Sequence, residues 1–164
     1  MTISKIKIIF IYFTLSSVVM LGVILYNDSH FKNNPLSVDI TKKIDAKNHE
    51  IVSLIKQKYG IYFNVPILIS DKMADNLFGL AVYTAKHEIK IVLNKNRFQE
   101  SVDYMVDYVL PHEYAHALMF KFGDFTKQNG GHTKKWQNIC LSLNGKKCDR
   151  YVKHNDIIFG KVPF

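Results

Sequence analysis

Arginine is nearly absent from this chain, although the chain is basic. Only two of its 164 residues are arginine, while the net charge is +8 and the pI is near 9.4. The other basic residues are lysines, scattered singly or in the pairs Lys42-Lys43, Lys134-Lys135 and Lys146-Lys147. Nucleic-acid-binding proteins concentrate basic residues in a stripe or block on one face. The scattered charge favours a soluble basic surface, and we do not expect a nucleic-acid partner.

Cysteine is also scarce, with only Cys140 and Cys148. A pair with so short a loop between its members is compatible with a disulfide in an oxidising compartment. It is equally compatible with two separate thiols, so the sequence leaves the pairing open. No internal repeat or low-complexity segment is present, and 164 residues are enough for one domain with its own core but not for two.

Charge is missing altogether from the stretch between Ile8 and Tyr26. As a helix, this run of about 19 residues would be roughly 28 Å long, close to the thickness of the hydrocarbon core of a membrane. A cleaved signal peptide is the alternative, but its apolar region is usually shorter and ends in small residues, which Val23–Asn27 does not provide. We therefore expect residues 1–26 to form an uncleaved transmembrane helix.

The orientation of this helix follows less directly from the sequence. Lys5 and Lys7 precede the apolar run and favour a cytoplasmic N-terminus, which would place the rest of the chain outside the cytoplasm. Three lysines beyond the run weaken that preference. Residues 27–37 are polar and rich in turn-forming residues and are expected to form a linker, and residues 38–164 are expected to form one domain.

The sequence His112-Glu113-Tyr114-Ala115-His116 contains the pattern H-E-x-x-H. On a helix, residues four apart lie on the same face, so both imidazoles can reach one metal ion of the size of zinc. Glu113 lies about 100° round the helix from His112. There it is beside the metal and can act as a general base toward water.

The flanking residues support a helix at this position. Pro111 is suited to a first helical turn, where its missing N–H has no cost, and Gly123 is suited to ending a helix. Good helix formers occupy most of the positions between them.

Two histidines do not complete a catalytic zinc site, which needs a third protein ligand and an open position. His132 is the best candidate, because it follows a double glycine that can turn tightly and because it opens a further helix. Asp124, Asp149 and His154 are the alternatives.

The periodicity of apolar residues predicts the other elements of an α+β domain. Helical spacing occurs over Val38–Tyr59, with Gly60 as its stop, and again from Thr133 to Leu143. Strands are expected at Ile67–Ser70, Gly79–Ala85 and Glu88–Asn94, a brief helical turn at Asp71–Leu77, and a helix at Arg97–Tyr108 that bends at Leu110-Pro111 into the motif helix.

The expected strands also bear on function. Pro66 confines the first strand to an edge or to a strand start. The strand Glu88–Asn94 is a candidate for aligning a peptide by edge pairing, but the sequence does not say which strand is the edge.

Three segments together resemble the SprT-like zinc metallopeptidases. They are Ile91–Asn94 before a helix, Val109–Ala117 with the H-E-x-x-H pattern, and Gly131–Trp136 with its histidine and tryptophan. The resemblance extends over roughly residues 45–150. It implies a small zincin-like α+β domain in which a short antiparallel sheet packs on the active-site helix.

The resemblance also implies the identity of the functional residues. It places His112, His116 and His132 on zinc and makes Glu113 the catalytic base of a peptidase. Two features depart from the family pattern: Thr133 stands where a glycine is usual, and the cysteine-rich zinc ribbon of many members is missing. A membrane segment does not suit the cleavage of proteins crosslinked to DNA, so that role is not carried over.

These observations lead to one expected function and two alternatives. The expected function is a membrane-anchored, zinc-dependent metallopeptidase acting on a protein or peptide substrate. The alternatives are a non-catalytic binding module stabilised by zinc and a basic, membrane-tethered nucleic-acid binder. The sequence does not give the oligomeric state.

Overall fold

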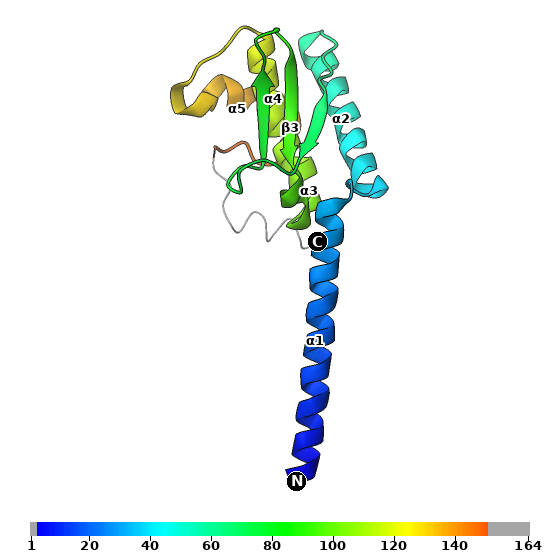
Figure 1. The fold of residues 1–164 in the computed structure, drawn as a ribbon. Helices are drawn as coiled ribbons and strands as arrows, with labels where there is room; N and C mark the ends of the chain where they lie inside the picture. Colours follow the sequence, from blue (N-terminus) through cyan, green and yellow to red (C-terminus); the bar gives the residue numbers. More distant parts are fainter. Residues whose placement is uncertain (1–2, 151–164) are drawn as a thin grey trace. The chain divides into compact units, whose positions relative to one another are not determined.

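The computed structural model describes residues 3–150. The chain divides after Leu36 into an N-terminal unit and a domain that begins at Ser37, one residue before the expected boundary (Figure 1). In chain order the domain contains α2 (Val38–Tyr59), β1 (Ile67–Ser70), β2 (Gly79–Tyr83), β3 (Ile89–Asn94), the 3-10 turn η1 (Lys95–Gln99), α3 (Val102–Tyr104), the π-helical turn η2 (Met105–Val109), α4 (Leu110–Lys121), the 3-10 turn η3 (Gln128–Gly131) and α5 (Lys134–Ser142).

The N-terminal unit contains a single helix, α1 (Ile3–Asn33). Its segment Lys5–Asn33 is long and apolar enough to cross a membrane, as the sequence predicts. The helix does not end at residue 26, so the expectation of a turn-rich linker is wrong for residues 27–33. An ion pair between Lys32 and Asp28, one helical turn apart at 2.7 Å, favours the helix there over the turns that the polar residues suggest.

Helix α2 begins and ends where the sequence predicts. The Ser37 hydroxyl accepts a hydrogen bond from the Ile40 N–H at its start, and Gly60, with φ of +71°, ends it by donating to Lys56 O. Its buried residues recur at helical spacing, so one face of the helix contributes to the core.

The sheet has the strand order β1-β3-β2, so β3 is central and both other strands are edges. β2 and β3 form the predicted antiparallel hairpin, whereas β1 pairs with β3 in parallel. The expectation of a purely antiparallel sheet is therefore wrong. β1 and β2 run in opposite directions. Because β1 lies next to β3 and not next to β2, its direct neighbour runs the same way as β1 does. The edge position of β1 agrees with Pro66, which precedes it.

The segment Asp71–Leu77 does not form the expected helical turn beyond one hydrogen bond, from Leu77 N–H to Ala74 O. The Asn94 side chain holds the end of this segment. Its amide donates to Ala74 O and to Leu77 O, at 3.2 and 2.8 Å, and so joins the segment to β3.

A nearly continuous helical run leads into α4, where the sequence predicted a bend. The run starts at Ser101, whose hydroxyl caps Tyr104 N–H, and not at Arg97. Pro111 has no N–H, and its ring conflicts with a regular turn before it. The wide turn η2 accommodates it, with Leu110 N–H bonded five residues back to Met105 O. The chain therefore passes Pro111 without a break.

Helix α4 is the centre of the domain. It packs against β2 and β3, and both α2 and α5 pack against α4 (Figure 1). Because neighbours surround it, most of its side chains are buried, including Leu110, Tyr114 and Leu118 with no exposed surface. The last helix, α5, is joined to the following loop by a disulfide between Cys140 and Cys148.

Replacing Asn94 by alanine tests the role of its amide in the sheet. Asn94 is fully buried, and its loss would leave Leu77 O without this donor and Ala74 O with the Leu77 N–H bond alone. We expect Asn94→Ala to lower the free energy of unfolding by about 2–4 kcal/mol, measured by urea denaturation. The exposed Asn76→Ala is the control, expected to stay within about 0.5 kcal/mol of the wild type. Equal midpoints for the two variants would contradict this role.

Candidate metal centre

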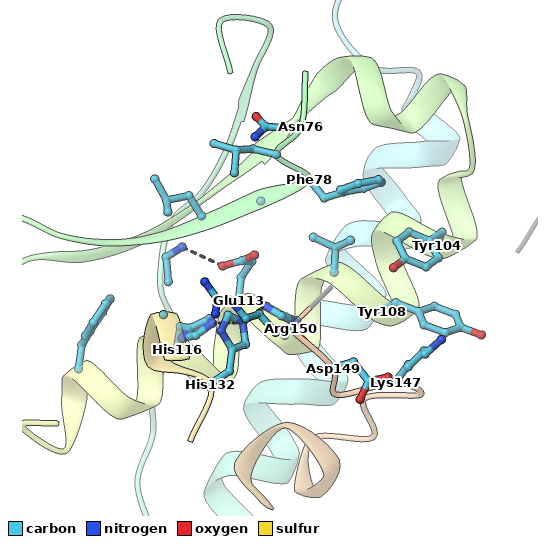
Figure 2. Close-up of a pocket in the computed structure, with 18 residues that line it drawn as sticks. Asn76, Phe78, Tyr104, Tyr108, Glu113, His116, His132, Lys147, Asp149 and Arg150 are labelled. Carbon is cyan, nitrogen blue, oxygen red and sulfur yellow. Dashed lines mark hydrogen bonds between the residues drawn. The ribbon is translucent and has the colours of Figure 1, made fainter. Parts of the chain in front are cut away.

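Three histidines from two parts of the chain converge at one point. His112 and His116 lie one turn apart on α4, and His132 follows η3. The Nε2 atom of His132 lies 3.0 Å from that of His112 and 3.2 Å from that of His116. Among residues 3–150, these three side chains form the one group whose donor atoms are close enough to hold a metal ion together. Figure 2 shows His116 and His132 beneath the carboxylate of Glu113.

The hydrogen bond made by Nδ1 of His132 determines which ring nitrogen carries the proton. Nδ1 lies 3.1 Å from Asn129 O, and because a carbonyl oxygen only accepts, Nδ1 must donate. The neutral ring then carries its lone pair on Nε2, which faces the other two histidines. A hydrogen bond from the far nitrogen to a backbone carbonyl is usual for a metal-binding histidine.

Burial keeps the three imidazoles in the neutral form that binds metals. Burial, followed by the charges of the other two histidines, lowers the pKa of His112 to about 3. Burial and then His132 lower the pKa of His116 to about 3, and burial also lowers the pKa of His132.

The nitrogen spacing fits zinc. A tetrahedral ion with Zn–N bonds of about 2.0–2.1 Å separates its ligand nitrogens by about 3.3 Å. The two separations that involve His132 are close to this value. Neutral imidazoles are ligands that zinc prefers, so the residues present fit this ion in both chemistry and spacing.

Trp136 packs against all three imidazoles. Its ring centroid lies 4.6, 5.2 and 4.4 Å from those of His112, His116 and His132, and the indole is only 1% exposed. The indole therefore restricts the rotation of the rings. Because Trp136 is the only tryptophan in the chain, its fluorescence is a direct probe of this site.

Glu113 lies beside the histidines and points toward the sheet. It is only 6% exposed, and its Oε2 accepts a hydrogen bond of 2.9 Å from Ala81 N–H on β2 (Figure 2). Burial raises the pKa of Glu113 to about 8, and the hydrogen bond from Ala81 opposes this shift. The carboxylate is thus held between α4 and the edge of the sheet.

Gly79 allows β2 to pass this close to Glu113. A Cβ atom at residue 79 would lie 2.8 Å from Glu113 Cγ and 2.9 Å from its Oε1, closer than real contacts allow. It would also lie 3.0 Å from Val109 Cγ1. A side chain at this position would therefore displace the carboxylate.

The strand over the site, β2, is an edge strand of the sheet that the described residues form. Phe78 O accepts from Asn94 N–H, and because the bonding alternates along an antiparallel pair, Gly79, Ala81 and Tyr83 direct their backbone groups away from β3. The edge available to a peptide at this site therefore belongs to β2. The expectation that Glu88–Asn94 could serve this purpose is wrong, because β3 lies in the middle of the sheet.

A cavity of about 470 Å³ opens over the histidines and Glu113. Aromatic side chains form one wall, and basic and acidic side chains from the loop after α5 lie nearby (Figure 2). The residues that line it, besides the histidines and Glu113, are Asn76, Leu77, Phe78, Gly79, Leu80, Ala81, Tyr104, Tyr108, Val109, Phe120, Gly130, Lys147, Asp149 and Arg150.

The structure brings His112, His116, His132 and Glu113 together, as the sequence predicts. The alternative ligands do not join the group. Asp124 instead accepts hydrogen bonds from Thr126 N–H and Lys135. Asp149 lines the cavity without belonging to the metal-binding group, and His154 lies outside the described residues.

Two neighbours of Glu113 were missed by sequence reasoning. Gly79 and Ala81 reach Glu113 only because β2 crosses α4, and no local pattern in the sequence indicates that crossing.

Comparison with known proteins identifies the family. The model of the SprT-like family matches residues 44–155, which is most of the domain and close to the extent of the resemblance in the sequence. No curated protein and no solved structure matches the chain.

Alanine at each of the three histidines tests the donor set. We expect His112→Ala, His116→Ala and His132→Ala each to lose most of the bound zinc, because two imidazoles do not complete a stable site. Zinc per chain, measured by elemental analysis, and the zinc-dependent change in Trp136 fluorescence report the loss. His49→Ala, which removes an exposed histidine on α2, is the matched control. Full zinc content in any of the three variants would remove that residue from the site.

Proposed function

The chain belongs to the SprT-like family, and we propose that it is a zinc-dependent metallopeptidase that hydrolyses peptide bonds. One observation supports the proposal most strongly. Three imidazoles converge, and Glu113, a buried residue of the helix that carries two of them, lies beside them without joining the group. Catalytic zinc sites have three protein ligands and an open position, which matches this arrangement.

The three histidines and Glu113 have separate roles in the proposed reaction. His112, His116 and His132 would hold the ion. When bound, zinc supplies positive charge that polarises a peptide carbonyl, acidifies water and opposes the raised pKa of Glu113. Glu113 accepts the proton of the attacking water and passes it to the leaving amine.

The surroundings of Glu113 support the role of a base. Burial makes its carboxylate more basic than an exposed one, and Ala81 N–H fixes one of its oxygens. A base must be held within reach of the proton that it takes, and this contact restricts its position.

The outer edge of β2, on the side away from β3, supports a peptide as the substrate. An extended chain that pairs with the outward backbone groups of Gly79 and Tyr83 would cross the site beside Glu113. The cavity beyond would then receive a side chain next to the scissile bond, against the stacked rings of Tyr104 and Tyr108.

A purely structural metal centre is the alternative. Such sites usually have four protein ligands, mostly cysteine. Both cysteines here are in the disulfide, and the metal-binding group in the described part of the chain has three histidines. A structural site also has no use for a buried carboxylate at this position, so the donor set supports catalysis.

Glu113→Gln separates catalysis from metal binding. Glutamine keeps the size of the side chain and an oxygen for Ala81 N–H but cannot take up a proton. We expect proteolysis to fall by about 10²–10⁴-fold, or about 3–5 kcal/mol in the barrier. Zinc content and thermal stability should stay close to those of the wild type.

The measurement is the rate of casein or peptide digestion with and without a chelator. Glu88→Gln, an exposed glutamate in the hairpin, is the matched control and should digest at the wild-type rate. Undiminished, chelator-sensitive digestion by Glu113→Gln would contradict the proposal.

We further propose that α1 anchors the protein in a membrane, with the domain outside the cytoplasm. The apolar length of α1 supports the anchor, and Lys5 and Lys7 before it support the orientation. The Cys140–Cys148 disulfide adds support, because such bonds persist mainly in oxidising compartments.

Fractionation and protease access test this topology. The full-length chain should remain in membranes through carbonate washing, and protease added after permeabilising only the outer barrier should degrade the domain. Both cysteines should resist alkylation until a reductant is added. A soluble product starting near residue 27 would indicate a cleaved signal peptide, and protection from the protease would indicate the opposite orientation.

A further inference from the structure

His132 is presented by a turn and not by a helix. Three successive residues before it, Asn129, Gly130 and Gly131, have positive φ angles of 51°, 63° and 83°. Asn129 is the one residue of the three with a side chain, and asparagine tolerates this conformation better than most. A ligand on such a turn is held by few backbone bonds, so other contacts must fix its position.

Asn129 supplies such contacts through its backbone and its side chain. Its backbone carbonyl accepts from His132 Nδ1, and its side-chain Nδ2 donates to His132 O at 3.2 Å. The remaining side-chain oxygen, Oδ1, accepts from Arg150 Nη1 at 2.8 Å. The turn and the ligand are thus joined to Arg150 through a single asparagine.

The guanidinium of Arg150 also lies against the turn itself. A Cβ atom placed on Gly130 would lie 3.4 Å from Arg150 Nη2 and 3.6 Å from Cζ. Arg150 therefore donates a hydrogen bond to Asn129 and lies close to the next residue of the left-handed turn, Gly130.

A disulfide fixes the segment from which Arg150 reaches the turn. Cys148, two residues before Arg150, is bonded to Cys140 on α5 with a Cα–Cα distance of 5.9 Å, and both cysteines are buried. The same helix carries Trp136, which packs on the three imidazoles. The disulfide therefore ties the backbone before Arg150 to the helix that supports the histidines.

We propose that Asn129 and Arg150 are positioning residues for His132. The Cys140–Cys148 disulfide completes this clamp by fixing the backbone that carries Arg150. The inference rests on the metal centre proposed above and adds that zinc affinity depends on groups that do not bind the ion. Groups of this kind typically change metal affinity by about 10–100-fold when they are removed.

Charge and position have opposite effects at Arg150, which makes the proposal testable. A guanidinium near the site repels a cation, so an effect of charge alone would make zinc bind more tightly when Arg150 is neutralised. A positioning role predicts weaker binding. Arg150→Met keeps the length but loses the donor and the charge, whereas Arg150→Lys keeps a donor and the charge.

The experiment is zinc affinity of the full-length chain in detergent, measured by chelator competition and followed by Trp136 fluorescence. We expect about 10–100-fold weaker binding in Arg150→Met and in Asn129→Gly, which keeps the left-handed turn but loses its side-chain bonds. Arg150→Lys should recover most of the affinity. Lys134→Ala, which removes an exposed lysine close to His132 in sequence, is the charge control and should bind as the wild type does.

The disulfide is tested with Cys140→Ser/Cys148→Ser, because dithiol reductants bind zinc themselves. This variant should also bind zinc about 10–100-fold more weakly than the wild type. Adding Arg150→Met to it should lower the zinc affinity only a little further, because both changes interrupt the same series of contacts.

Two results would overturn the proposal. Wild-type affinity in Arg150→Met and Asn129→Gly, with binding lost in His132→Ala, would overturn the clamp alone. A wild-type chain that binds no zinc would overturn the metal centre and the clamp together.

Discussion

The site depends on one buried contact, in which the carboxylate of Glu113 accepts a hydrogen bond from Ala81 N–H. Removing a charged carboxylate from water costs several kcal/mol, and a single backbone donor offsets only part of that cost. The fold keeps the contact because β2 crosses α4 at a glycine, where no side chain separates strand from helix. The same crossing places the outer edge of β2 beside the histidines. The positions of Glu113, the three histidines and this edge are therefore consequences of one packing arrangement.

Helix α4 can carry this arrangement because it is fixed on nearly every side. The strands, α2 and α5 all pack against it, and most of its apolar residues are buried. The π-helical turn before Pro111 lets the chain enter the helix without a break. Two of the histidines thus belong to a helix that is packed on several sides, whereas the third, His132, lies on a turn that needs support from elsewhere.

Local signals in the sequence were sufficient for most elements and for the residues that converge at the candidate site. Ser37 and Gly60 mark the ends of α2, alternation marks β3, and helix geometry alone places the two histidines of H-E-x-x-H on one face, with the glutamate beside them. These features depend on neighbours a few residues apart.

Features that depend on distant contacts could not be predicted. The parallel pairing of β1 with β3, the choice of β2 as the edge beside Glu113, and the contact between Arg150 and Asn129 join segments far apart in the chain. The loop before β2 is held by the Asn94 side chain, which comes from a later strand. Local propensity gives no information on any of these pairings.

We propose that Glu113 acts on a peptide beside a bound zinc ion, from a position that the glycine in β2 permits. Zinc content and peptide hydrolysis of the wild type and Gly79→Ala test this proposal, because the atoms nearest to the added methyl group belong to Glu113 and Val109. We expect one zinc per chain in both proteins, with chelator-sensitive hydrolysis in the wild type and little in the variant. Zinc-loaded wild-type protein without hydrolysis, or Gly79→Ala with the wild-type rate, would contradict it.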